Sequence, residues 1–423
     1  MAINTTISLP GDKSISHRAV MLASIADGVS ELTNLNDGKD VQSTIKALQA
    51  CGALIENDDK KLIITGTTLS NPKKPIDCGN SGTSARLLSG FLSSQGLQFS
   101  LTGDDSLSSR PMDRVIVPLT QMGCHIESNN GLLPLIVDAS GPLNGINYKM
   151  PVASAQVKSS ILLAGLGAES SSNVSEINTS RNHTEIMLHH MGATITVMDR
   201  DIHIEPLSSS LEPITMDIPS DPSSASFFIV LTVLMKESQV TVRNMLLNPT
   251  RIGFMNILNK IGIPATISNQ HHMNGELCGD VSVESSSVDG FEVSSYAIPS
   301  IIDEIPILSV LAAAGKGKTV FNGIEELKFK ESNRLEAMSV GLKKCKIDNS
   351  VTSNGIEIFG GELFGANVDS YDDHRIAMAF SIAGIISKGN MNILNTKNVS
   401  TSFPDFYKIM KSLGIKNERE IDT

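Results

Sequence analysis

The sequence predicts an α/β protein of two domains, each built from three βαβαββ units, and three observations lead to this fold class. The chain has 423 residues, which is about three times the length of a typical domain. An apolar helix that opens on a turn of small and polar residues recurs six times, at intervals of roughly 70 residues. Segments of alternating apolar and polar residues lie between these helices, as expected for paired strands.

The first helix of each unit is rich in Ala, Ser and Leu and begins at a turn rich in Gly, Ser, Asp or Asn. These helices and their openings cover residues 11–28, 79–94, 153–169, 220–235, 302–317 and 371–389. Segments such as ASFFIVLTVLM are apolar on all sides, and a helix of this kind is stable when it is surrounded by protein. We therefore expect these helices to be buried inside their domains.

The second helix of each unit is amphipathic and ends at a glycine or a short polar turn that leads into strands. These segments are residues 43–57, 115–128, 184–197, 255–268, 335–349 and 406–417. Their single apolar stripe predicts that they cover the outside of the domains. The alternating segments KLIITG, DIHIEP and GIEIFG supply strands, with Asn, Asp and Gly at the turns between them.

Six units divide into two domains of three, with a boundary near residues 218–222. The N-terminal strand TTISLP precedes the first unit and is free to pair with a strand of the other domain. Such pairing would connect the domains through two segments of the chain.

Composition is that of an ordinary globular protein and argues against several function classes. Hydrophobic residues make up 40% of the chain and charged residues 19%, so disorder is not expected. The net charge of -11 disfavours a protein that follows a nucleic-acid backbone or an anionic membrane. Five cysteines without a close pair indicate neither a disulfide framework nor a zinc site. The start MAINTTISLP has no secretion signal, and we expect a soluble cytoplasmic protein.

The unusual residues lie at the openings of the predicted buried helices. Residues 11–14, with His17 and Arg18, place cations and a hydroxyl at a helix start. Free backbone N–H groups and the helix dipole already favour an anion there. The segment therefore predicts a phosphate or carboxylate site, although a capped surface helix with solvated charges explains it about equally well.

Other openings in the first half show the same device more weakly. The Gly-rich turn at residues 80–83 would let the backbone approach a ligand closely, and Arg110 follows a polar loop. Residues 154–158 and 180–183 open two further helices. Taken singly, each segment has a simpler explanation as a helix cap or an exposed loop charge.

Acids and cations also stand together in the second half. Asp303 and Glu304 interrupt an apolar stretch, where a carboxylate caps a helix or acts as a general base. Residues 330–334 and 372–375 each combine acids with bases just before a helix. Cations spread over both halves of an acidic chain predict a small substrate with several anionic groups, held between the two domains.

Two further patterns have simpler explanations. Gly317-Lys318-Thr319 is similar to the end of a phosphate loop, but the earlier glycine is replaced by Ala312, so we interpret the segment as a turn into a strand. The paired histidines that begin at His189 and His271 lack companions at metal-ligand spacing, so no metal site is predicted.

Seven ordered motifs carry a resemblance to a known family. They are LPGDKSISHRA, GNSGTSARLL, SRPMDRV, ASAQVKSS, SRNHTE, KFKESNRL and DDHRIAM. In this order, and over essentially the whole chain, they resemble the 5-enolpyruvylshikimate-3-phosphate synthase (EPSP synthase) family. SRPMDRV and ASAQVKSS resemble its class II branch.

The resemblance implies a two-domain inside-out α/β barrel, the enolpyruvyl transferase fold, with six βαβαββ units. It implies a first domain over residues 12–220, a second domain over residues 1–11 and 221–423, and an active site in the cleft between them. The implied reaction transfers the enolpyruvyl group of phosphoenolpyruvate to the 5-hydroxyl of shikimate 3-phosphate and releases phosphate, through a tetrahedral intermediate. This step belongs to the shikimate pathway of chorismate and aromatic amino acid biosynthesis. The resemblance implies two small-molecule substrates, no cofactor, no metal and a cytoplasmic monomer.

The resemblance also implies roles for the residues that match the motifs. Shikimate 3-phosphate would be bound by Lys13, Ser14, Arg18, Ser154, Ala155, Gln156, Ser180, Arg181, Asp303 and Lys330. Phosphoenolpyruvate would be bound by Lys13, Gly82, Arg110, Gln156, Arg334 and Arg375. Asp303 is implied as the base at the 5-hydroxyl, and Glu331 would exchange a proton with Lys13. The sequence leaves open which of the two carboxylates is the dominant base.

Two positions depart from the family's pattern, and two alternative functions remain. Thr401 stands where some members carry a lysine, and Glu326 where some carry an asparagine. One alternative is the related transferase that acts on UDP-N-acetylglucosamine, which is disfavoured because GDKS replaces a GAKN-like opening. The other is a non-catalytic anion-binding protein on the same scaffold, which is disfavoured because the acids and cations of the motifs occur together.

Overall fold

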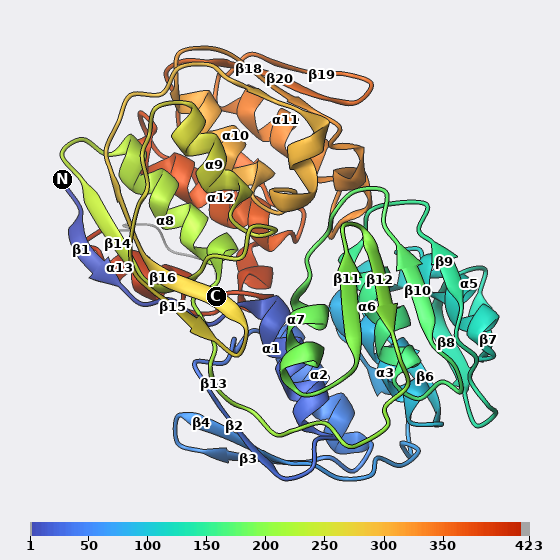
Figure 1. Ribbon diagram of the computed structural model, residues 1–423. Helices are drawn as coiled ribbons and strands as arrows, with labels where there is room; N and C mark the ends of the chain where they lie inside the picture. The colour runs from blue at the N-terminus through green and yellow to red at the C-terminus, as the bar shows by residue number, and fades with distance from the viewer. Residues whose placement is uncertain (1, 416–423) are drawn as a thin grey trace. The chain divides into compact units, whose positions relative to one another are not determined.

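The computed structural model describes residues 2–415, and the chain divides into two compact units (Figure 1). Unit 1 comprises residues 1–10, 219–271 and 277–423, and unit 2 comprises residues 11–218 and 272–276. Residues 416–423, which the sequence analysis assigned to the second domain and in part to its last helix, lie outside the described residues.

Three buried helices form the centre of each unit. In unit 2 they are α1 (Lys13–Ala23), α3 (Gly82–Ser94) and α6 (Ala155–Gly165). In unit 1 they are α8 (Pro222–Leu234), α10 (Ile305–Ala314) and α12 (His374–Ile386). Every residue of α8 except Leu234 is buried, and α8, α10 and α12 pack against one another. The six predicted buried helices are therefore confirmed.

The second helix of each βαβαββ repeat lies outside the three buried helices of its compact unit and exposes one side. These helices are α2 (Lys39–Ala50), α5 (Asp113–Met122), α7 (His183–His190), α9 (Gly253–Lys260), α11 (Arg334–Lys344) and α13 (Phe406–Ser412). Shorter helical segments are α4 (Asp105–Ser108) and the 3-10 helices η1 (Ser295–Ser300), η2 (Glu325–Phe329) and η3 (Thr396–Thr401).

Each unit carries three small sheets around its buried helices, and the strand order repeats. Unit 2 contains β13 (Thr215–Asp217), β2 (Val29–Thr33), β4 (Lys61–Thr65) and β3 (Leu54–Asp58); β5 (Ile76–Asp77), β6 (Gln98–Thr102), β8 (Leu132–Asp138) and β7 (His125–Asn129); and β9 (Asn147–Lys149), β10 (Ser172–Ser175), β12 (Asp201–Ile204) and β11 (Ile195–Met198), in spatial order. In each sheet the first two strands are parallel, and the last two form an antiparallel hairpin.

Unit 1 repeats this plan twice in full. Its sheets contain β1 (Asn4–Ile7), β14 (Gln239–Leu246), β16 (Glu276–Glu284) and β15 (Thr266–Met273); β17 (Glu292–Val293), β18 (Gly317–Asn322), β20 (Gly355–Gly360) and β19 (Asn349–Val351); and the pair β21 (Asn367–Asp369) and β22 (Asn392–Leu394). The sixth βαβαββ repeat differs from the prediction, because within residues 2–415 it has two strands instead of four.

The first strand of one sheet in each unit comes from a distant part of the sequence. In unit 1, β1 pairs in parallel with β14, which confirms the predicted role of the N-terminal strand. Ser220 Oγ also bonds to the Leu9 carbonyl at 3.3 Å. In unit 2, β13 closes the first sheet by pairing with β2. The N-terminal segment is therefore part of unit 1, although unit 2 follows it directly in the sequence.

Candidate active site

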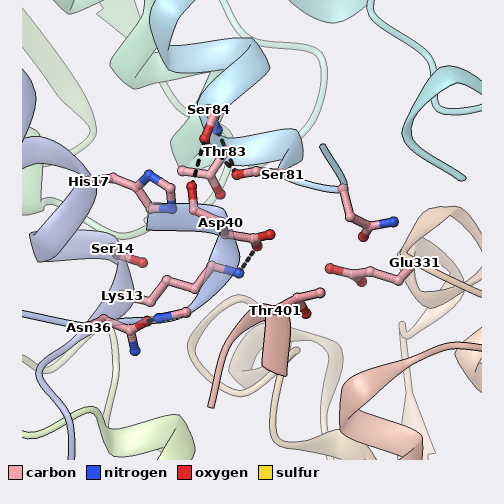
Figure 2. Close-up of polar contacts among 12 residues, drawn as sticks. Lys13, Ser14, His17, Asn36, Asp40, Ser81, Thr83, Ser84, Glu331 and Thr401 are labelled. Atoms are coloured by element: carbon pink, nitrogen blue, oxygen red, sulfur yellow. Dashed lines mark hydrogen bonds and ion pairs between the residues drawn. The ribbon is translucent and has the colours of Figure 1, made fainter. Parts of the chain in front are cut away.

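The opening of α1 places a lysine beside a carboxylate. The Asp12 side chain accepts a hydrogen bond from the Ile15 N–H at 2.9 Å and caps the helix, so Lys13 and Ser14 occupy its first turn. Lys13 Nζ forms an ion pair with the Asp40 carboxylate of α2, as Figure 2 shows. Both side chains are only partly exposed. The ammonium group is therefore held at a helix N-terminus, where a ligand anion is favoured.

A chain of buried hydrogen bonds runs behind this lysine. His17 Nδ1 is 2.7 Å from Thr44 Oγ1, and Thr44 Oγ1 is 2.7 Å from Ser84 Oγ. Ser84 Oγ is 2.8 Å from Ser81 Oγ and donates to the Asp40 carbonyl at 3.2 Å. Burial, together with the charges of Lys13 and Arg18, lowers the pKa of His17 well below 6.5. The ring is therefore neutral at pH 7.

Two arginines meet the first turn of α1. Arg18 donates to the Ser14 carbonyl at 2.8 Å, to Thr184 Oγ1 at 2.7 Å and to Ser159 Oγ at 2.7 Å. Burial lowers the pKa of Arg18 to about 10, so the guanidinium remains charged at pH 7. Arg181 Nη1 donates to Ser14 Oγ at 3.3 Å. The structure thus brings the predicted residues Ser14, Arg18 and Arg181 together.

A second cationic group surrounds the opening of α3. A Cβ atom at Gly82 would lie 2.9 Å from Arg86 Nη1 and 3.5 Å from Arg110 Nη1, so the two guanidinium groups approach the space that a side chain would occupy here. Arg86 Nη1 donates to Gln156 Oε1 at 2.8 Å, and Gln156 Nε2 donates to Thr83 Oγ1 at 3.0 Å. Gly82, Arg110 and Gln156 were predicted from the sequence, and the structure places them in one neighbourhood.

The opening of α6 lies on a buried ion cluster. Ser154 caps the helix and Ala155 is its first residue. One turn later, Lys158 Nζ lies 2.9 Å from Glu176 Oε2 and 2.7 Å from Glu185 Oε1, and these side chains are 1–4% exposed. Glu176 also accepts hydrogen bonds from Ser180 N and Oγ. This cluster fixes the turn that carries the predicted residues Ser180 and Arg181.

In unit 1, Asp303 lies between two arginines at the opening of α10. Its Oδ1 is 3.4 Å from Arg334 Nη1, and its Oδ2 is 3.6 Å from Arg375 Nη2. Arg375 Nη1 also donates to the Asp303 carbonyl at 3.0 Å. The Asp303 side chain is 15% exposed, so its carboxylate remains accessible to a ligand. Such a group accepts a proton from a hydroxyl placed beside it.

Arg334 is the centre of a carboxylate cluster. Its guanidinium contacts Glu331 at 2.5 Å and Asp373 at 2.8 Å in addition to Asp303. Burial by itself would lower the pKa of Arg334, but the charges of Asp373, Glu331 and Asp303 outweigh it and raise that pKa. Asp373 caps α12 by accepting from the Arg375 N–H at 2.9 Å. The predicted residues Asp303, Glu331, Arg334 and Arg375 therefore belong to one cluster.

Lys330 stands beside this cluster in a partly buried position. Burial lowers its pKa, and the negative charge of Asp303 opposes that shift. Behind Asp303, the fully buried Glu304 accepts a hydrogen bond from Ser223 Oγ. Arg251 donates to the same hydroxyl at 3.1 Å and forms an ion pair with Asp221 at 2.8 Å. These contacts tie the opening of α10 to that of α8.

Ten of the residues predicted from motifs lie in unit 2 and five in unit 1. Sequence reasoning missed Asp40 and Arg86, which contact predicted residues directly. Arg86 did leave a signal, because an arginine in an otherwise apolar buried helix needs a polar partner. Asp40 left none, since an acid in the first turn of an amphipathic helix is common.

Within residues 2–415 there is no cluster of three or more His, Cys, Asp or Glu side chains arranged to hold a metal ion. No helix in the same range is both long and apolar enough to cross a membrane. What the described residues offer is cationic groups at helix openings in both units and accessible carboxylates in unit 1. This set can bind small anions and move protons.

Comparisons with known proteins agree over nearly the whole chain. The model of the family described as EPSP synthase (3-phosphoshikimate 1-carboxyvinyltransferase) matches residues 1–410. A 3-phosphoshikimate 1-carboxyvinyltransferase from Thermoanaerobacter sp. is 43% identical over 410 residues, which cover 96% of this chain and 97% of that protein.

Solved structures give the same result. An EPSP synthase from Acinetobacter baumannii superposes with a TM-score of 0.88 at 38% identity, covering 98% of this chain and 96% of that one. The enolpyruvyl transferase NikO from Streptomyces tendae superposes with a TM-score of 0.80, covering 98% of this chain and 95% of that one. At 15% identity, that second likeness concerns the fold alone. The predicted enolpyruvyl transferase fold is confirmed.

Proposed function

Because the chain belongs to the EPSP synthase (3-phosphoshikimate 1-carboxyvinyltransferase) family, we propose that it transfers the enolpyruvyl group of phosphoenolpyruvate to the 5-hydroxyl of shikimate 3-phosphate and releases phosphate. The observation that carries this proposal is the match over residues 1–410, which includes all the acids and cations gathered at the helix openings. Two strongly anionic substrates account for so many cations in a chain of net charge -11.

We assign the binding of the acceptor, shikimate 3-phosphate, to residues of both units. In unit 2 they surround the openings of α1 and α6 and the turn before α7: Lys13, Ser14, Arg18, Ser154, Ala155, Gln156, Ser180 and Arg181. In unit 1 they are Asp303 and Lys330. The contacts of Arg18 with the Ser14 carbonyl and of Arg181 with the Ser14 hydroxyl support this assignment. Two guanidinium groups beside the same serine suit a phosphate.

Phosphoenolpyruvate is assigned the second group of cations. Gly82, Arg110 and Gln156 would contact it from unit 2, and Arg334 and Arg375 from unit 1, with Lys13 near both substrates. A glycine at position 82 leaves room for a ligand beside the guanidinium groups of Arg86 and Arg110. Charge that develops on the departing phosphate would be stabilised by these fixed donors.

The chemistry requires one base and one acid. Asp303 would take the proton of the 5-hydroxyl while that oxygen adds to C2 of phosphoenolpyruvate, and C3 would gain a proton in the same stage. Loss of a C3 proton and of phosphate then restores the enol. Glu331 and Lys13 would exchange the C3 proton. All atoms come from the two substrates and these side chains, so the proposed reaction uses no cofactor.

We place this reaction in the cytoplasm, because all five cysteines are buried thiols, as suits a reducing compartment. The partners we propose are the two small molecules, and we propose that the enzyme acts as a monomer. Size-exclusion chromatography with light scattering at assay concentration tests that last point, and a dimer mass would contradict it.

The test is phosphate release from the purified protein. Phosphoenolpyruvate is supplied alone, with shikimate 3-phosphate, and with UDP-N-acetylglucosamine, and we expect release only with shikimate 3-phosphate. Asp303→Ala should lower kcat by about 10²- to 10⁴-fold, the usual effect of a general base. Asp289→Ala, which removes an exposed carboxylate from the same unit, is the matched control and should keep full activity. Phosphate release that occurs with the UDP-sugar and not with shikimate 3-phosphate would refute the proposal. No release with either acceptor would refute it as well.

A further inference from the structure

The buried hydroxyls of Thr44 and Ser84 join α1, α2 and α3, and the openings of α1 and α3 carry proposed substrate contacts. Thr44 lies on α2 and Ser84 on α3, both are 0% exposed, and their oxygens are 2.7 Å apart. On the α1 side, Thr44 bonds to His17, one turn after Lys13. On the α3 side, Ser84 N and Oγ both bond to Ser81 Oγ, next to Gly82. The hydroxyl pair thus links the two openings.

Ser84 Oγ is the junction of this chain. It has three oxygen neighbours, namely Thr44 Oγ1 at 2.7 Å, Ser81 Oγ at 2.8 Å and the Asp40 carbonyl at 3.2 Å. Because Asp40 forms the ion pair with Lys13 through its carboxylate, its backbone and its side chain are held by different helices (Figure 2). A displacement of Ser84 would therefore reach the Lys13 ammonium through Asp40.

A purely structural role explains these contacts less well. Buried hydroxyls must be taken out of water, and apolar side chains of the same shape hold helices together about as well. Other serines of α3 show the ordinary arrangement: Ser89 Oγ donates at 2.8 Å to the Ala85 carbonyl of its own helix. Thr44 and Ser84 instead form hydrogen bonds between helices, Thr44 with His17 of α1 and Ser84 with the Asp40 carbonyl of α2.

We propose that Thr44 and Ser84 are positioning residues that hold Asp40, and through it Lys13, in register with the α3 opening during enolpyruvyl transfer. This inference rests on the proposed function. The two residues touch neither substrate. They fix the distance between the group that carries the proton and the turn that holds phosphoenolpyruvate, and a small misplacement there lowers the rate more than the affinity for the acceptor.

The test compares matched variants. Thr44→Val keeps the shape of the side chain and removes the hydroxyl, Thr44→Ser keeps the hydroxyl, and Ser89→Ala removes a hydroxyl from α3 that serves only its own helix. We expect Thr44→Val to lower kcat by about 10- to 100-fold with KM for shikimate 3-phosphate changed less than about 2-fold. Thr44→Ser and Ser89→Ala should stay within about 2-fold of the unchanged protein. Ser84→Ala asks the same question should Thr44→Val fail to fold.

An Asp40→Asn background shows whether the effect passes through the lysine contact. If it does, Thr44→Val should cost clearly less kcat in that background than in the unchanged protein, because the ion pair it supports is already lost. Equal losses in both backgrounds, or a loss for Thr44→Val no larger than for Ser89→Ala, would overturn the inference. Absence of phosphate release from the unchanged protein would instead refute the proposed function.

Discussion

At the scale of single residues, the strongest structural demand is the burial of charge. Lys158 is 1% exposed and satisfies two glutamates whose side chains are 2% and 4% exposed. We predict that Lys158→Met destabilises the protein by about 3–5 kcal/mol, because it leaves two buried carboxylates without their cation. Urea unfolding at pH 7 measures the change.

Two comparisons give that measurement its meaning. Adding Glu176→Gln and Glu185→Gln to Lys158→Met removes the uncompensated charges and should recover most of the loss. Lys61→Met removes a lysine whose ion pair with Glu31 spans 2.8 Å between side chains that are 50% and 41% exposed, and it should change nothing measurable. Equal effects of Lys61→Met and Lys158→Met would contradict the prediction.

A second prediction for a single residue concerns pH. The folded protein lowers the pKa of His17 well below 6.5, chiefly through burial. Below pH 6.5 the unfolded chain therefore binds a proton that the folded chain does not, and stability falls as the pH falls. From pH 7.5 to 5.5 this amounts to about 1.4 kcal/mol, since His17 takes up about one proton only on unfolding.

The contribution of His17 is found by difference, because carboxylates also titrate in this range. The loss of unfolding free energy between pH 7.5 and 5.5 should be smaller in His17→Asn than in the unchanged protein by about 1.4 kcal/mol. His125→Asn changes a histidine whose side chain is 78% exposed and serves as the control, for which we expect the loss of the unchanged protein. An unchanged loss in His17→Asn would show that His17 is not the residue responsible.

Which site residues the sequence could reveal depends on how unusual they are locally. Lys13 and Arg375 lie in the first turn of apolar helices and Arg18 lies one turn further along α1, so the pattern singles them out as cations near a helix N-terminus. Asp40 is different, because its importance comes from Lys13, 27 residues away in the sequence and in contact only after α1 and α2 have packed. Contacts of that kind leave no local signal.

At the scale of elements, the buried helices were predictable and several strands were not. A helix such as α8, apolar on all sides, has only one stable environment, so its burial follows from the sequence. β5 and β17 have two residues each, and pairing with a neighbouring strand rather than their own composition defines them. Within residues 2–415 the sixth βαβαββ repeat has two strands instead of the four that the repeat pattern predicted.

Close packing of α3 on α6 gives a prediction at the same scale. A Cβ atom at Gly90 would lie 1.9 Å from the Ser160 carbonyl oxygen, so the two helices would have to separate. Helix propensity favours alanine over glycine by about 1 kcal/mol, but the clash should outweigh it. We expect Gly90→Ala to destabilise the protein by about 1–3 kcal/mol, measured by urea unfolding.

Gly141→Ala provides the contrast, because a Cβ atom there meets nothing within 4 Å. This variant should unfold at the same urea concentration as the unchanged protein, or slightly above it, since alanine restricts the unfolded chain. If Gly90→Ala were as stable as Gly141→Ala, the close approach of α3 and α6 would be wrong.

At the scale of the whole molecule, each compact unit includes a segment that is distant in the sequence from the rest of that unit. The two compact units meet at residues 218 and 219, and the repeat pattern led us to expect a boundary near residues 218–222. The segment 272–276 clusters with unit 2 although it joins two strands of a unit 1 sheet. Glu276 lies 2.6 Å from His183 there. No pattern in the sequence signals this, since the contact spans 93 residues and depends on the tip of one hairpin.

This path predicts different behaviour for two fragments of the chain. Residues 11–218 contain every strand of the three unit 2 sheets, so this fragment should fold cooperatively by itself. Residues 219–423 lack β1, which leaves β14 without its parallel neighbour and removes Ile3, Ile7 and Leu9 from the core. At about 1.5–3 kcal/mol for each buried side chain, the loss is comparable to the whole stability of a domain.

We therefore expect fragment 219–423 to show no cooperative urea transition by circular dichroism, and to regain one when residues 2–10 are supplied as a peptide. The matched control is a peptide of the same length in which Ile3, Ile7 and Leu9 are replaced by Ser, which keeps the backbone but cannot fill the core. Rescue by the natural peptide alone would show that side-chain burial, more than strand pairing, holds the N-terminus in unit 1. A fragment 219–423 that unfolds cooperatively without any peptide would contradict the argument, because the core would then be complete without β1.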